Sequence, residues 1–182
     1  MGNYLEKIVN ELAENAKQIN QDEISQLITE IKTARHIFLK GAGRSGIAIQ
    51  AFANRLLHLG FSVSVVGEIS SPHSKERDLL IICSSSGETT SLVSLAEKAS
   101  QNKLNIALVT TNKESSIGKL ASVIIDLLTT SKPRPVTQEF TQPMGTSFEQ
   151  LSFLLFDSIV LDLMELLDET SQSMSLRHAD LE

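Results

Sequence analysis

Apolar residues recur at helical spacing over the first part of the chain. Residues 5–19 carry apolar side chains three or four positions apart, and residues 24–31 repeat the spacing. Such spacing puts apolar side chains on one face of an amphipathic helix. The pattern predicts two helices within residues 3–33, separated by a break near residues 20–22.

Between residues 35 and 127, short apolar runs alternate with helical segments near 46–59, 89–102 and 115–121. The apolar runs predict five strands: His36–Leu39, Phe61–Val66, Leu79–Cys83, Asn105–Val109 and Val123–Leu127. Strand–helix–strand repetition with short connections is typical of a parallel sheet covered on both faces. We therefore expect an α/β fold, a three-layer sandwich with a five-stranded parallel sheet, and we expect the strand order 2-1-3-4-5.

The remainder of the chain is expected to form a loop, a helix and a tail. Residues 129–145 contain three prolines and end in a glycine, which predicts an irregular loop. A last helix and a polar tail are expected over 146–182. Because this helix is apolar on more than one face, part of it is expected to pack against another subunit. The length of 182 residues favours one domain.

Composition and charge narrow the classes of function. The 16 Lys and Arg against 22 Asp and Glu give a net charge of −6, which disfavours nucleic-acid binding through a broad basic surface. Acidic residues interrupt the most apolar stretch, 151–167, and the N-terminus has no apolar signal segment. We therefore expect a cytoplasmic protein with no membrane segment. The single cysteine, Cys83, is expected to be buried, and the four histidines lack the spacing of a metal site.

Two segments rich in glycine and hydroxyl groups follow predicted strands and open predicted helices. They are Gly41–Gly46 and Ser84–Thr90. Glycine lets the backbone approach a ligand closely, and a helix start offers N–H groups that bind phosphate. In the expected strand order the two preceding strands are neighbours, so both loops would meet in one crevice. The alternative is that each loop is a tight turn in which Ser45, Ser86 or Thr89 caps a helix.

The first loop also matches a different pattern. Gly41, Gly43 and Gly46 fit the dinucleotide fingerprint G-x-G-x-x-G, and Glu68 lies near the end of the next strand, where a ribose-binding acid would sit. A nicotinamide-dependent enzyme is therefore an alternative. It is disfavoured because the chain has no room for a second nucleotide-binding half and a substrate domain.

The chain resembles the sugar isomerase (SIS) family over essentially its whole length. The resemblance is carried by Gly41–Gly46, Arg55–Phe61 and Ser84–Thr89, and more specifically by Gln142–Gln150 and Arg177–Glu182. It implies a SIS-type fold and a ketose–ketose isomerase that interconverts D-arabino-hex-3-ulose 6-phosphate and D-fructose 6-phosphate without metal or organic cofactor. It also implies a homotetramer in the ribulose monophosphate pathway of formaldehyde fixation, with a metabolic link to 3-hexulose-6-phosphate synthase.

The implied reaction moves a carbonyl between C3 and C2, so it needs a base, stabilisation of an enediol(ate) and an anchor for the phosphate. The resemblance assigns the base to Glu149, and His58 is a second catalytic candidate that could polarise the carbonyl or shuttle protons. The expected substrate- and phosphate-binding residues are Gly43, Arg44, Ser45, Ser84, Ser85, Ser86, Gly87, Glu88, Thr89 and His178. Ser85 stands where the family usually has glycine, and His178 is a candidate for reaching a neighbouring subunit's site.

Other interpretations remain open at this point. Glu149 also fits a first-turn acid stabilised by the helix dipole, and His58 fits a favourable C-terminal helix residue. A non-catalytic SIS sensor of a sugar phosphate would keep both loops without needing Glu149. A related aldose–ketose isomerase acting on another phosphosugar is a further alternative.

Overall fold

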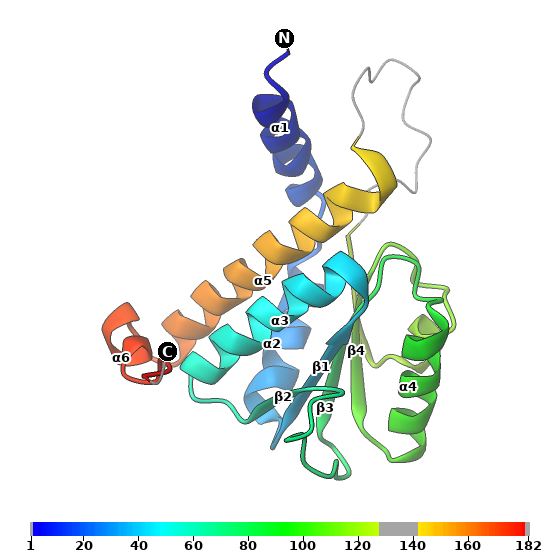
Figure 1. Cartoon of the computed structure of the whole chain (residues 1–182), viewed down its shortest axis with the longest axis vertical. Helices are drawn as coiled ribbons and strands as arrows, with labels where there is room; N and C mark the ends of the chain where they lie inside the picture. Colours follow the sequence, from blue (N-terminus) through cyan, green and yellow to red (C-terminus); the bar gives the residue numbers. More distant parts are fainter. Residues whose placement is uncertain (1, 128–141, 181–182) are drawn as a thin grey trace.

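A five-stranded parallel sheet forms the middle layer of the computed structural model, which describes residues 2–127 and 142–180 (Figure 1). The strand order is β2-β1-β3-β4-β5, which confirms the predicted fold class. The strands are β1 (Ile37–Gly41), β2 (Val63–Val65), β3 (Leu79–Cys83), β4 (Asn105–Thr110) and β5 (Val123–Asp126). Every residue of β3 is buried, as expected for a central parallel strand covered on both faces.

The helices cover the two faces of the sheet unequally. They are α1 (Tyr4–Ala16), α2 (Gln21–Thr33), α3 (Gly43–His58), α4 (Thr90–Gln101), α5 (Thr146–Leu166) and α6 (Ser171–Ser175). The side chains of Leu39 and Ile81 pack with α2, α3 and α5, whereas those of Phe38 and Leu80 pack with α4. This alternation follows from the two-residue period of a strand, and it divides the core into two layers.

Helix α1 reaches beyond the sheet and contacts α5 (Figure 1). Its apolar side chains are only partly covered, since Tyr4, Leu5 and Val9 are exposed. Among the described residues, no helix has the length and apolar character that a membrane span requires.

Two local predictions differ from the structure or lie partly outside the described residues. The helix predicted near 115–121 is wrong, because only a 3-10 turn forms, η1 (Gly118–Leu120). The turn is tight, because a Cβ atom at Gly118 would overlap the Lys113 carbonyl. Glycine also has a low helix propensity, which disfavours a longer helix here. Most of the predicted loop 129–145 lies outside the described residues, and its end forms a 3-10 turn, η2 (Pro143–Gly145).

The predicted polar tail turns back onto the body of the protein. It contains α6, which begins with a capping box between Thr170 and Ser173. Met174 is buried in the core, and Arg177 Nη1 donates a hydrogen bond of 2.9 Å to the His58 carbonyl. The tail is therefore fixed near the C-terminal ends of α3 and α5 (Figure 1).

Candidate active site

The two glycine- and hydroxyl-rich loops begin side by side at the carboxyl ends of β1 and β3. These strands are paired, with Gly41 opposite Cys83. This position is the switch point of the sheet, because β2 lies on one side of β1 and β3 on the other. The predicted convergence of the loops is confirmed.

The first loop is a close turn from β1 into α3. A Cβ atom at Gly41 would come within 2.9 Å of the Gly46 nitrogen, so the turn requires glycine there. No side chain caps α3, whose N-cap residue is Ala42. Ser45 lies in the first turn of the helix, so the capping alternative fails for this residue. The uncapped helix start is suited to an anion.

The second loop is held by its own hydroxyl groups. The Ser84 hydroxyl accepts a hydrogen bond of 3.2 Å from the Gly87 N–H, and the Ser86 hydroxyl accepts one of 3.1 Å from the Glu88 N–H. Gly87 has φ +64, which glycine adopts without strain. Thr89 occupies the N-cap position of α4, but its side chain makes no capping bond. Its hydroxyl is therefore available to a ligand.

Residues at the end of β4 support this loop, and the sequence analysis missed them. The Thr110 and Thr111 hydroxyls each donate a hydrogen bond of 2.9 Å to the Ser85 carbonyl. Ser85 itself does not have a positive φ, and its hydroxyl lies 3.3 Å from that of Thr111. Serine is thus accommodated where the family usually has glycine. The signal that could have found these threonines is their place directly after an apolar strand.

Glu88 is exposed and points toward the turn that follows β4. One of its carboxylate oxygens accepts a hydrogen bond of 2.7 Å from the Ser116 N–H. This bond lowers the pKa of the Glu88 carboxyl. The contact connects the second loop to that turn.

Glu149 lies in the first turn of α5 and reaches the first loop. Its carboxylate forms an ion pair with the Arg44 guanidinium, although 105 residues separate them. The Glu149 side chain is 19% exposed and that of Arg44 is 62% exposed. The carboxylate is therefore largely covered, while the guanidinium remains open to solvent.

Cys83 lies close to both the first loop and α5, and it directly precedes the second loop. Burial, with a smaller contribution from the Glu149 charge, raises the pKa of its thiol to about 12, whereas hydrogen bonds to Ser152 and Ser45 oppose the shift. The thiol lies 3.6 Å from the Ser152 hydroxyl of α5. A buried structural thiol, as predicted, thus lies beneath the point where the two loops and α5 come together.

His58 and His178 are brought together, but far from Glu149 of the same chain. Their ring centroids are 5.2 Å apart, and Arg55 Nη1 lies 3.3 Å from His58 Nδ1. Burial lowers the pKa of His58, and the charges of His178 and Arg55 lower it further. His58 lies fourteen positions after Arg44 in α3, and a rise of about 1.5 Å per residue puts them about 21 Å apart along the helix. A cavity of about 440 Å³ adjoins the two histidines.

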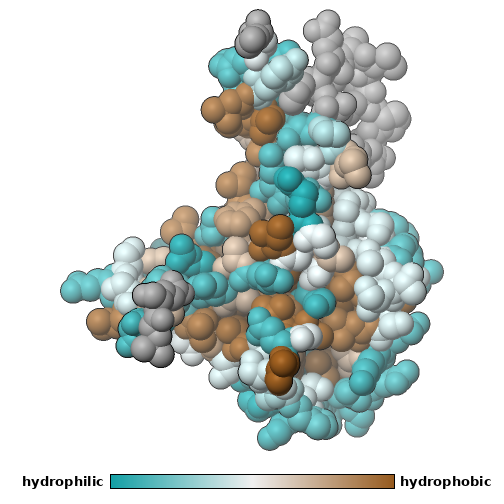
Figure 2. Space-filling view, in the orientation of Figure 1, coloured by the Kyte–Doolittle hydropathy of each residue, from teal (hydrophilic) through white to brown (hydrophobic). Residues whose placement is uncertain are grey.

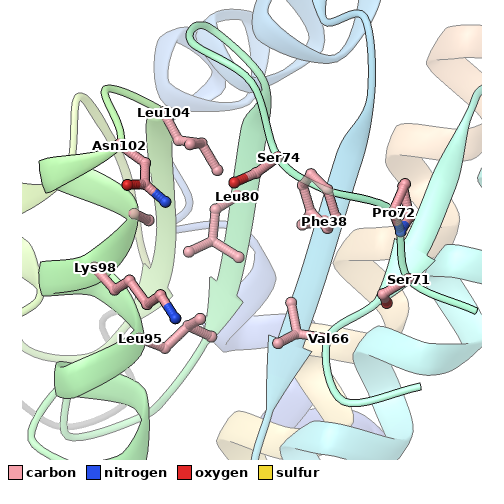
Figure 3. Close-up of a pocket in the computed structure, with 11 residues that line it drawn as sticks. Phe38, Val66, Ser71, Pro72, Ser74, Leu80, Leu95, Lys98, Asn102 and Leu104 are labelled. Carbon is pink, nitrogen blue, oxygen red and sulfur yellow. The ribbon is translucent and has the colours of Figure 1, made fainter. Parts of the chain in front are cut away.

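A second groove, of about 200 Å³, lies on the α4 face of the sheet (Figure 3). Its floor contains Phe38 and Leu80, near the amino ends of β1 and β3, and Lys98 of α4 points into it. The groove is therefore separate from the crevice at the carboxyl ends. Among the described residues, no three His, Cys, Asp or Glu side chains are grouped to hold a metal ion.

Comparisons with known proteins identify the family. A model described as the SIS domain matches residues 30–155. The 3-hexulose-6-phosphate isomerase of Bacillus subtilis (strain 168) is 44% identical over 180 residues, covering 98% of this chain and 97% of that protein. The 3-hexulose-6-phosphate isomerase of Mycobacterium gastri is 31% identical, covering 99% of this chain and 90% of its own length.

A solved structure supports the same family assignment. This is the crystal structure of a Methanococcus jannaschii protein, from which a molecular function of 3-hexulose-6-phosphate isomerase was inferred. It matches this chain with a TM-score of 0.85 at 30% sequence identity. The match covers 98% of this chain and 99% of that one. The chain therefore belongs to the SIS domain family, in the branch that contains the 3-hexulose-6-phosphate isomerases of B. subtilis and M. gastri.

Proposed function

We propose that this protein interconverts D-arabino-hex-3-ulose 6-phosphate and D-fructose 6-phosphate, with Glu149 as the base. One observation carries the proposal: the Glu149 carboxylate is paired with Arg44 of the first loop, and its charge raises the pKa of Cys83, the residue directly before the second loop. A carboxylate beside two anion-binding loops suits proton abstraction from a phosphorylated sugar. The full-length relatives named 3-hexulose-6-phosphate isomerase support the substrate assignment.

The phosphate would bind at the starts of α3 and α4. Neither helix has a side-chain cap, so their N–H groups and positive dipole ends can meet an anion. The Ser86 and Thr89 hydroxyls add donors from the second loop. Fixing the phosphate there holds the sugar so that one base can reach two adjacent carbons.

The chemistry needs one proton transfer at each of two carbons. Glu149 removes the proton from C2 of the hexulose phosphate, the C2–C3 enediolate forms, and the protonated carboxyl returns a proton to C3. At the same time O2 loses its proton as the new carbonyl forms, and O3 gains one. The Arg44 guanidinium, adjacent to the base, can face the oxyanion that develops at these oxygens.

The histidines would serve the site of a neighbouring copy in a homotetramer. Within one chain, about 21 Å of helix separates His58 from the first loop, so His58 and His178 can contact the substrate only in another subunit's crevice. Exposed apolar residues supply a surface for assembly: Leu154 and Leu161 on α5 are 52% and 66% exposed, and Leu5 on α1 is 72% exposed. Figure 2 shows hydrophobic side chains on the outer side of α1.

Subunit mixing tests this arrangement of the histidines. Glu149→Gln and His58→Ala subunits, each inactive alone, should regain activity when they are unfolded together and refolded, because some crevices then receive a wild-type residue from each chain. Mixtures that stay inactive although mixed oligomers form would contradict the assignment of His58 to a neighbouring site.

The reaction itself is tested with fructose 6-phosphate in deuterated water. A ketose–ketose isomerase passes through the C2–C3 enediol, so NMR should detect deuterium at C3. Deuterium at C1 would indicate an aldose–ketose isomerase. Binding without exchange and without a second ketose product would indicate a sensor, and either result would overturn the proposed activity. The link to 3-hexulose-6-phosphate synthase, as the source of the hexulose phosphate, belongs to the same proposal.

A further inference from the structure

The turn directly before Glu149 has an unusual backbone. Met144 has φ +53 and Gly145 has φ +75, so two consecutive residues are in the left-handed region. Met144 is 98% exposed, so burial of its side chain does not stabilise the turn. Gly145 is the N-cap residue of α5 and provides no side-chain cap. Within the turn, the Thr146 hydroxyl and backbone N–H donate hydrogen bonds to the Pro143 carbonyl, and contacts from outside the turn can add to these in holding the strained backbone.

A carboxylate on α1 provides such contacts. Glu11 Oε1 accepts a hydrogen bond of 2.8 Å from the Ser147 hydroxyl, and Glu11 Oε2 accepts one of 3.1 Å from Gln142 Nε2. Gln142 precedes the turn and Ser147 follows it, so one side chain bridges both ends. The bonds are charge-assisted, and the carboxylate lies at the N-terminus of a 21-residue helix, where a negative charge is favoured.

We propose that Glu11 is a positioning residue that sets the place of the Glu149 carboxylate in the crevice. Ser147 and Glu149 belong to the same first turn of α5, so a shift of Ser147 moves Glu149 relative to Arg44. Helix α1, which reaches beyond the sheet and packs against α5, thereby acts on the chemistry (Figure 1). This inference rests on the proposed role of Glu149 as the base.

Kinetics separate positioning from simple structural support. Glu11→Ala should lower kcat about 10–100-fold, since misplacement by about 1 Å can cost 10²-fold. KM for the sugar phosphate should stay within about twofold, because the phosphate loops are untouched. Glu11→Gln, which keeps an acceptor for Ser147, should recover part of kcat. Glu14→Ala is the matched control, since Glu14 is on the same helix but pairs with Lys17.

The proposal would be overturned by a Glu11→Ala kcat within twofold of wild type. It would also be overturned if kcat, KM and melting temperature changed together and Glu11→Gln gave no recovery. If Glu11→Ala does not fold, Ser147→Ala provides the same test, with the same expected split between kcat and KM.

Hydrogen exchange keeps this test distinct from that of the proposed function. If Glu149→Gln retained turnover, Glu149 would not be the base, whatever Glu11 does. Glu11→Ala should still increase amide exchange in the first turn of α5 relative to Glu14→Ala. Unchanged protection there would refute the contact on which the inference depends.

Discussion

The Gly87→Ala substitution tests the packing of the second loop. Two separate effects, one on the backbone and one on a neighbouring side chain, should destabilise this variant. The φ of +64 at Gly87 makes any L side chain unfavourable, at a cost of about 1–2 kcal/mol. A Cβ atom would in addition overlap the buried Ser115 side chain, and overpacking of this kind costs about 1–3 kcal/mol. Gly43 is the matched control, since it has φ +56 but no atom within 4 Å of an added Cβ.

Thermal denaturation of Gly87→Ala and Gly43→Ala measures how much the overlap between the added Cβ atom and Ser115 destabilises the protein. For a chain of this size, 1 kcal/mol shifts the melting temperature by about 2–4 °C. Gly87→Ala should therefore melt about 2–12 °C below Gly43→Ala, and adding Ser115→Gly should remove most of the difference. Gly87→Ala should also raise KM, because the loop carries Ser84 and Ser86. Equal melting temperatures for the two alanine variants would refute the packing described for this loop.

Two other predictions follow from the buried titratable groups. Cys83 should resist a thiol reagent at pH 8 in the native state, because burial and a pKa of about 12 leave about 10⁻⁴ of it as thiolate; labelling within seconds would contradict this. Burial lowers the pKa of His58 and of His36 below the unfolded value of about 6.5. The unfolded chain then binds more protons below that pH, so the free energy of unfolding should fall as the pH drops from 7.5 to 5.5. Urea denaturation should show this fall, and His58→Gln should reduce it; a flat profile in the wild type would count against the burial of these rings.

Most of the fold could be predicted because parallel strands buried on both faces produce apolar runs. Leu79–Cys83 is the strongest example, and it became β3 with the predicted bounds. The switch-point rule then predicts that Gly41–Gly46 lies beside Ser84–Thr89, from the expected strand order alone. The start of α3 was less predictable: the helix begins at Gly43 rather than 46, because two glycines near a strand end look like a loop.

Long-range contacts could not be predicted from local pattern. The hydrogen bonds of Glu11 join residues 131 and 136 positions apart, and no periodicity indicates them. The approach of His178 to His58 depends on α6, which turns the tail back, and on Arg177, which binds the His58 carbonyl. Contacts of this kind are set by tertiary packing, so they appear only when the whole chain is folded.

The central claim is that Glu149 transfers the proton of a phosphosugar held between the two loops. Its most direct test compares wild type with Glu149→Gln for deuterium uptake at C3 of fructose 6-phosphate, with affinity measured by calorimetry. A general base contributes about 10²–10⁴-fold to the rate, so exchange should fall by at least about 10²-fold while the dissociation constant stays within about threefold. Exchange at an undiminished rate in Glu149→Gln would contradict the assignment of the base and the account built on it.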